Sequence, residues 1–204
     1  MGYRIRIFAL SDAPVELTKL RGVVPAGQEL IDESGESLEW TQLLLKHVAG
    51  PEIAVIERDP VMPGQLGAEE IQEFLENIQG EKPDSAVNWL TGFLPKVKVI
   101  FALQLLNGTD VGEGWRGVHA IQNKLWSELG GILQADGEGL SNEDGYHILW
   151  QFDGEPQGSW NMAVLESNGN WTAFEMKLED KNQREAFLEG RIPPGAKVLG
   201  KPKP

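Results

Sequence analysis

The last third of the chain constrains the fold most, because it consists of short apolar runs separated by tight-turn sequences. The runs cover 131–136, 145–152, 160–167 and 171–179, and the segments between them are rich in Gly, Asn, Asp and Ser. These residues favour reverse turns, and strands that are joined by short reverse turns pair antiparallel. We therefore predict antiparallel strands here, and not parallel strands joined by helical crossovers.

Earlier parts of the chain show both strand-like and helix-like periodicity. Residues 3–10 alternate in polarity and predict a first strand, and residues 11–26 predict a loop with a short helical turn. Residues 28–61 predict three meandering strands, although the run 38–47 also fits a helix. Further on, the sequence predicts a central strand over 96–106 and four helices, over 67–80, 82–95 (starting at Asp84–Ser85), 115–129 and 181–190.

Together these elements predict an α+β protein with a mixed, mainly antiparallel sheet and helices packed on one face. We expect a single domain over residues 1–204, with a soft boundary near 80–83 between an N-terminal half and a C-terminal sheet half. The expected central strand at 96–106 would serve both halves, so we do not expect them to be independent.

A glycine-rich loop precedes the predicted helix at 115–129. Gly112, Gly114 and Gly117 have the G-x-G-x-x-G spacing of dinucleotide-binding loops, and Asp136 lies nineteen residues after Gly117. The loop does not open directly from the preceding strand, bulky side chains occupy the positions next to a phosphate, and a hairpin meander follows. We therefore interpret this segment as a structural loop and expect no cofactor.

The formal net charge of −13 limits the class of partner. A nucleic-acid-binding protein neutralises phosphates with Lys and Arg, and an anionic membrane makes the same demand. We therefore predict neither a nucleic-acid nor a membrane partner. From 103 to 176 the only Lys or Arg residues are Arg116 and Lys124, which suggests either a region that attracts cations or a basic partner or, as we prefer, a plain acidic solvated surface. With no cysteine and no recognisable targeting segment, we predict a cytoplasmic protein.

Several polar groups are candidates for a site, although none forms a specific catalytic or metal-binding motif. Four carboxylates within 136–144 suggest either an irregular calcium loop or, as we prefer, a hairpin connection, and we expect no metal. Glu57, Arg58 and Asp59 suggest a local ion pair. A pocket in the C-terminal half would draw its polar and aromatic walls from Trp115, Arg116, His119, Asp136, Glu138 and His147.

Tryptophan usage is unusual, with seven Trp and two Tyr in the chain. If 171–179 is a strand, Phe174, Met176 and Leu178 share one face and Trp171 lies on the other. Tryptophans either cap the edge of a core or line grooves and contacts with partners.

We carry two hypotheses about function. The preferred one is a non-enzymatic interaction or regulatory module that binds a protein partner or itself through an acidic surface and exposed aromatic residues. The alternative is a small-molecule-binding protein or an enzyme with the polar and aromatic pocket described above, and whether the protein is an enzyme stays open.

Overall fold

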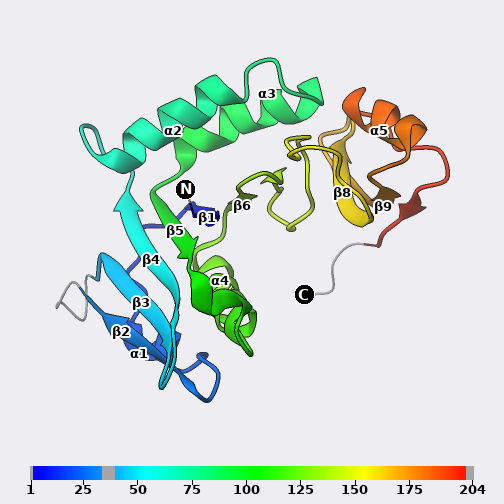
Figure 1. Cartoon of the computed structure of the whole chain (residues 1–204). Helices are drawn as coiled ribbons and strands as arrows, with labels where there is room; N and C mark the ends of the chain where they lie inside the picture. Colours follow the sequence, from blue (N-terminus) through cyan, green and yellow to red (C-terminus); the bar gives the residue numbers. More distant parts are fainter. Residues whose placement is uncertain (1, 34–39, 201–204) are drawn as a thin grey trace. The chain divides into compact units, whose positions relative to one another are not determined.

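The computed structural model describes residues 2–33 and 40–200 (Figure 1). The chain divides into two compact units, unit 1 formed by residues 1–70 and 97–131 and unit 2 formed by residues 71–96 and 132–204. Both combine helices with antiparallel strands, so the predicted α+β class is confirmed. The single-domain prediction, with its soft boundary near 80–83, stays a prediction.

Unit 1 contains a five-stranded antiparallel sheet in the order β2-β3-β4-β5-β1. The prediction for 28–61 is confirmed, and the run 38–47 contributes a strand rather than a helix. Within the predicted meander, residues 34–39 lie outside the described residues. The strands are β1 (Arg4–Ala9), β2 (Gln28–Asp32), β3 (Gln42–His47), β4 (Glu52–Pro60) and β5 (Val99–Leu105).

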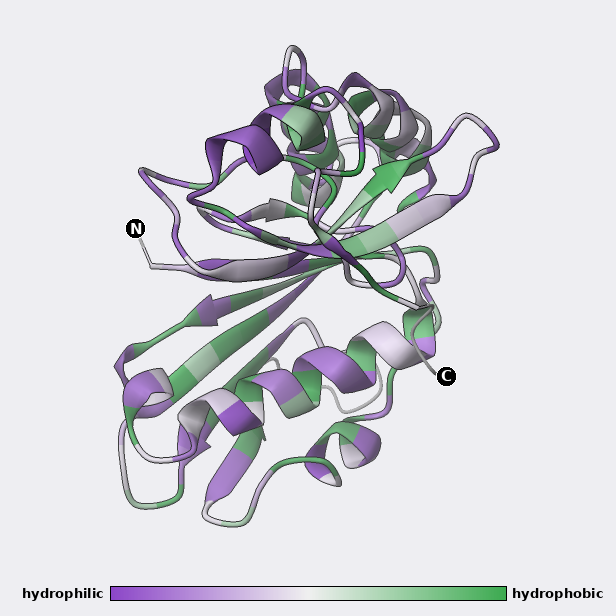
Figure 2. Ribbon diagram, turned by 90° about the vertical axis from the view of Figure 1, so that its right-hand side faces the viewer, coloured by the Kyte–Doolittle hydropathy of each residue, from purple (hydrophilic) through white to green (hydrophobic). Residues whose placement is uncertain are grey.

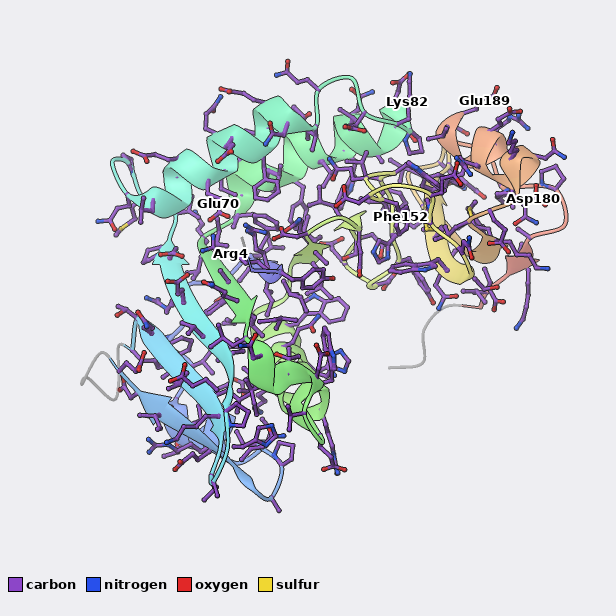
Figure 3. All side chains as sticks on the ribbon, in the orientation of Figure 1. Arg4, Glu70, Lys82, Phe152, Asp180 and Glu189 are labelled. Carbon is purple, nitrogen blue, oxygen red and sulfur yellow. The ribbon has the colours of Figure 1, made fainter. Side chains whose placement is uncertain are left out.

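Strand β5 is central, as predicted, because it pairs with β4 on one side and with β1 on the other. Its residues Val99, Ile100 and Phe101 are almost completely buried, which fits a strand covered on both faces. The first strand is more polar, and its Arg6 Nε lies 2.7 Å from Oε1 of Glu70, which is labelled in Figure 3. The register therefore places the apolar residues of β5 at the centre of the sheet.

Helix α4 (Gly114–Leu129) follows the 3-10 turn η2 (Asn107–Asp110) and buries Val118, Ile121, Leu125 and Leu129. The glycines before and in it allow close packing. A Cβ atom on Gly114 would meet the carbonyl oxygens of Gly108 and Thr109, and one on Gly117 would meet the side chains of Gln28 and Leu45. This packing explains the glycine spacing without a nucleotide.

The remaining helices are short. Helix α1 (Leu17–Arg21) is the predicted helical turn, and helix α2 (Leu66–Asn77) has residues in both units. Helix α3 (Asp84–Phe93) continues into the 3-10 turn η1 (Leu94–Lys96). The helix begins at Asp84, as predicted, and Pro83 occupies the cap position without a side-chain hydrogen bond. The helices carry both hydrophobic and hydrophilic segments, as amphipathic helices do (Figure 2).

Unit 2 has two groups of antiparallel strands. One is the hairpin of β6 (Ile132–Ala135) and β7 (Gly139–Leu140), and the other is a three-stranded sheet in the order β10-β9-β8. The three strands are β8 (Ser159–Leu165), β9 (Trp171–Lys177) and β10 (Lys197–Val198). Reverse turns therefore join β6 to β7 and β8 to β9, as the turn sequences predict.

Helix α5 (Lys181–Leu188) packs Phe187 against one face of the β8–β9 hairpin, where Met162, Val164, Phe174 and Met176 form the core. Cross-strand pairs such as Met162–Phe174 and Trp160–Met176 share that face. Trp171 pairs with Leu165 and lies on the other face, as predicted.

The strand predicted over 145–152 is wrong. Only His147 makes bridges there, an antiparallel one with Ser141 and a parallel one with Met162. The apolar residues are nevertheless used: Ile148 and Leu149 are fully buried, and the half-buried Trp150 and Phe152 pack against the core around Phe187. The run therefore contributes packing rather than a ladder of backbone hydrogen bonds.

Candidate functional site

Three of the six predicted site residues lie in the first two turns of helix α4. The Trp115 ring contacts the His119 ring at a centroid distance of 5.5 Å, and its Nε1 donates to Oδ1 of Asp110 at 3.1 Å. Arg116 forms an exposed ion pair with Glu113 at 3.1 Å. The Arg116 charge is therefore partly compensated within its own helix turn.

The other three predicted residues belong to unit 2. Asp136 and Glu138 occupy the turn between β6 and β7, and Nε2 of Gln134 donates to Oδ1 of Asp136 at 3.4 Å. His147 lies in the loop before β8. That these three residues and the three on α4 form one site stays a prediction.

Asn142 holds the loop that carries His147. Its side chain is fully buried, and its Oδ1 accepts hydrogen bonds from the backbone N–H groups of Asp144 and Tyr146, both at 3.0 Å. Its own N–H donates to the carbonyl oxygen of Tyr146 at 2.8 Å. An Asn that folds the backbone on itself in this way makes a compact turn, which fixes the direction in which Tyr146 and His147 leave it.

The His147 ring packs among aromatic side chains. It stacks on Phe152 at 5.9 Å and meets the edge of Trp160 at 4.6 Å. Phe152, which is labelled in Figure 3, also touches Trp150 and Trp160, each at 5.0 Å. Burial among these rings lowers the pKa of His147 to about 4, because it disfavours the charged imidazolium. His147 is therefore neutral at physiological pH and acts as an aromatic packing residue.

Two shallow hollows lie beside the β8–β9 hairpin. The first, which we call the Trp160 hollow, has a volume of about 520 Å³ and is lined by Gly145, His147, Ser159, Trp160, Asn161 and Glu175. The second, the Trp171 hollow, has about 370 Å³ and includes Asp144, Tyr146, Asn170, Trp171 and Thr172 in its lining. The loop at 144–147 contributes to both hollows, whereas Trp160 and Trp171 belong to opposite faces of the hairpin; we call the two hollows together the aromatic surface of unit 2.

Trp171 is held in place from the side. The edge of its ring system meets Trp89 of helix α3 at a centroid distance of 5.3 Å. Next to it, Oγ1 of Thr172 donates to Oε1 of Glu166 at 2.7 Å, and the N–H of Asn170 donates to Oδ1 of Asn168 at 2.8 Å. The hairpin turn is thus ordered by its own side chains and presents a half-buried indole at its base.

The surroundings of the aromatic surface are acidic. Residues 132–176 contain eight Asp and Glu residues and no Lys or Arg. Two of these acids, Asp144 and Glu175, line the hollows. Glu175 has Lys197 of β10 at 3.9 Å, but both side chains are exposed and such a pair contributes little energy. The aromatic surface therefore combines flat rings with negative charge.

The tryptophans divide between the two roles considered from the sequence. Trp40 is fully buried and Trp115 is 39% exposed, whereas the other five are half-buried. Trp126 donates from Nε1 to the carbonyl oxygen of Gly131 at 2.9 Å, which is a structural use. The place of Tyr146 in the lining of a hollow could not be predicted from the sequence, because it depends on the turn made by Asn142.

The expected ion pair within 57–59 is wrong. Arg58 makes no ion pair with Glu57 or Asp59, because consecutive strand residues point to opposite faces of a sheet. Asp59 instead has its pKa raised, mainly by burial and also by Glu57 on its own face, while Arg4 opposes the shift.

Two features are absent from the described residues, a helix that could cross a membrane and a cluster that could hold a metal ion. None of the helices in residues 2–33 and 40–200 is both long and apolar enough to cross a membrane. Over the same ranges, no three His, Asp or Glu side chains gather in an arrangement that holds a metal ion. Comparison of the chain with protein-family models, with curated proteins and with solved structures finds no match in any of the three.

Proposed function

We propose that this protein is a non-enzymatic interaction module that binds a basic protein partner through the aromatic surface of unit 2. The proposal rests on one observation. Three aromatic residues that line the hollows, Tyr146, Trp160 and Trp171, all lie within residues 132–176, a stretch of 45 residues that holds eight acids and no Lys or Arg.

The physical basis is that Lys and Arg side chains bind both components of such a surface. A guanidinium or ammonium over the face of Trp or Tyr contributes about 0.5–1 kcal/mol at an exposed site. Asp144 and Glu175 add attraction at short range, and the net charge of the whole chain steers a basic partner toward it.

Self-association fits this surface less well. A symmetric dimer through the aromatic surface would place the same acidic residues opposite one another, and juxtaposed like charges oppose association. We therefore favour a basic partner over a second copy of this chain.

The proposal is tested with two synthetic nine-residue peptides, one of alternating Arg and Gly and one of alternating Glu and Gly. We expect the Arg peptide to bind and the Glu peptide not to bind, with a dissociation constant that rises steeply between 50 and 300 mM salt. Trp171→Ala and Tyr146→Ala should each weaken binding about threefold to tenfold, which corresponds to about 0.7–1.4 kcal/mol. Isothermal titration calorimetry measures these constants.

Trp115→Ala is the matched control, because Trp115 is exposed and has carboxylates nearby but lies on α4. If Trp115→Ala weakens the Arg peptide as much as Trp171→Ala does, the binding is a diffuse charge effect and the proposal is wrong. The same conclusion follows if the peptide does not bind. Sedimentation velocity at increasing protein concentration tests self-association, which we expect to be absent up to about 100 μM, a concentration typical of weak complexes.

Small-molecule binding is the second candidate. The Trp171 hollow favours it, because its volume of about 370 Å³ falls within the range of about 300–1,000 Å³ of ligand sites. It is open, with exposed polar residues such as Asp144 and Asn170 at its rim, whereas ligand sites usually enclose most of their ligand. The openness is why a protein surface is the preferred occupant.

A further inference from the structure

A third hollow lies in unit 1, and unlike the two hollows of unit 2 it is lined by cationic side chains. It has a volume of about 530 Å³ and lies where β4 ends and β5 begins. Two cationic side chains, Arg58 and Lys98, line it together with Asp12. The rest of the lining is mainly apolar and consists of Pro14, Val15, Trp40, Pro60, Val61 and Met62. We call this the cationic groove.

Backbone hydrogen bonds fix the walls of the cationic groove. The N–H of Val61 donates to the carbonyl oxygen of Lys98, and the N–H of Lys98 donates to the carbonyl oxygen of Ala9, both at 2.8 Å. Nε1 of Trp40 donates to the carbonyl oxygen of Val15 at 2.9 Å, and the Trp40 ring packs on Phe101 at 5.7 Å. Of the lining residues only Arg58 and Pro60 lie within a strand, and these hydrogen bonds tie the adjoining segments to the sheet and its core.

The two cations are not neutralised within the described residues. Nη2 of Arg58 donates to the backbone carbonyl oxygen of Asp12 at 3.4 Å, a long contact with a neutral group. Neither Arg58 nor Lys98 forms an ion pair within residues 2–33 and 40–200, whereas Arg6, Lys46, Lys82 and Lys124 all do. In a chain with 31 acids and 18 Lys and Arg residues, two cations that line one hollow, form no ion pair in the described part of the chain and have Asp12 as the single acid beside them in the lining are a local reversal of charge.

We infer that the cationic groove binds a small organic carboxylate whose apolar body rests against Pro60, Val61 and Met62. The guanidinium of Arg58 matches the two oxygens of a carboxylate, and the ammonium of Lys98 adds a point charge. The apolar walls exclude strongly hydrated inorganic anions from close contact, because such anions would lose water without gaining polar partners. Met62, which is 48% exposed, gives the wall an adaptable surface.

Asp12 opposes this ligand and sets a testable sign. Asp12 lines the same groove, so its negative charge repels a bound carboxylate, while its backbone carbonyl accepts a hydrogen bond from Arg58. Replacing Asp12 with Asn removes the repulsion and keeps the size of the side chain. The inference thus demands that one substitution strengthen binding and another weaken it.

The test uses 4-phenylbutyrate as the probe and its neutral amide as the comparison compound, followed by ¹H–¹⁵N NMR titration of the full chain. We expect the amide to bind at least tenfold more weakly than the carboxylate. Lys98→Gln should raise the dissociation constant of 4-phenylbutyrate about fivefold to tenfold, and Asp12→Asn should lower it about twofold to threefold. Shifted resonances should cluster at residues 58–62 and 98.

Lys19→Gln is the matched control, since Lys19 is an exposed cation of unit 1 that does not line the groove. It should leave the dissociation constant within twofold of the unaltered chain. The inference is overturned if 4-phenylbutyrate does not bind, if the amide binds equally well, or if Lys98→Gln behaves like Lys19→Gln. Because Lys98 is exposed, its substitution is not expected to unfold the protein.

Discussion

At the scale of single residues, His147 links burial to pH. Its backbone bridges to β8, its ring lies among the rings of Phe152 and Trp160, and its pKa falls from 6.5 to about 4. In the unfolded chain the imidazole titrates near 6.5. Between these two values the unfolded state binds a proton that the folded state does not, so acid favours unfolding.

We expect the contribution of His147 to the free energy of unfolding to be fully present above pH 6.5 and to be lost as the pH falls toward 4. Each unit of pKa difference corresponds to about 1.4 kcal/mol, so the loss over this range is on the order of 3 kcal/mol. Urea unfolding between pH 4 and pH 7 measures it. His147→Phe keeps an aromatic ring and should flatten the dependence. His119→Gln, which alters an exposed histidine on α4, should leave it as in the unaltered chain; a flattened curve there would contradict the assignment.

Arg58 shows what can and cannot be predicted at this scale. The sequence shows Arg58 between two acids, which suggests an ion pair, but strand geometry sends it to the opposite face, where it lines a groove with Lys98. Lys98 is forty residues away in sequence, so only the pairing of β4 with β5 brings the two together. Local sequence identifies the charge, and the register of the sheet determines its neighbours.

At the scale of elements, periodicity predicted most strands and helices, because alternation and amphipathic spacing reflect burial directly. It failed at 145–152, where apolar residues follow one another without forming a ladder. A run of apolar residues indicates burial, but backbone pairing also requires a partner strand in register, and Asn142 turns the chain away just before it. The hollows beside β8 and β9 depend on that turn and were therefore not predictable.

The start of helix α4 offers a test of whether its glycine is needed for packing. Gly114→Ala would drive a Cβ atom against the backbone oxygens of Gly108 and Thr109, which cannot rotate away. We expect a loss of about 1–3 kcal/mol in the free energy of unfolding, as for other overpacked sites. Chemical denaturation measures it.

Gly92→Ala is the matched control for Gly114→Ala. Gly92 lies in helix α3, and a Cβ atom there meets nothing within 4 Å. Because Ala has a higher helix propensity than Gly, the free energy of unfolding of this variant should be about 0.5–1 kcal/mol higher than that of the unaltered chain. Equal effects of the two substitutions would contradict the packing role of Gly114.

At the scale of the whole molecule, neither unit is a continuous piece of chain. Residues 97–131 return to unit 1 after residues 71–96 have entered unit 2, and residues 132–204 then complete unit 2. Such interleaving is not visible in the charge, because the two halves of the sequence have similar numbers of acidic and basic residues. The central strand β5 was nevertheless predictable from the sequence. Because β5 pairs with both β4 and β1, a cut that separates it from these strands should disrupt the sheet of unit 1.

A chain cut at the soft boundary near 80–83 provides the corresponding test. The fragment 1–82 contains β1, β2, β3 and β4 but lacks β5, which pairs with both β4 and β1. Without β5, its ladder with β4 and its ladder with β1 are both lost, and the apolar residues Ile7, Phe8 and Ile56 lose their covering neighbours. We expect fragment 1–82 to show little regular structure by circular dichroism and poorly dispersed ¹H–¹⁵N NMR spectra.

Mixing it with fragment 83–204 should restore the dispersion of the full chain if both fragments stay in solution, because the missing strand returns with the second fragment. A well-dispersed spectrum of fragment 1–82 alone would show that the N-terminal half folds by itself, and the sheet order in unit 1 would then not be what holds that half together.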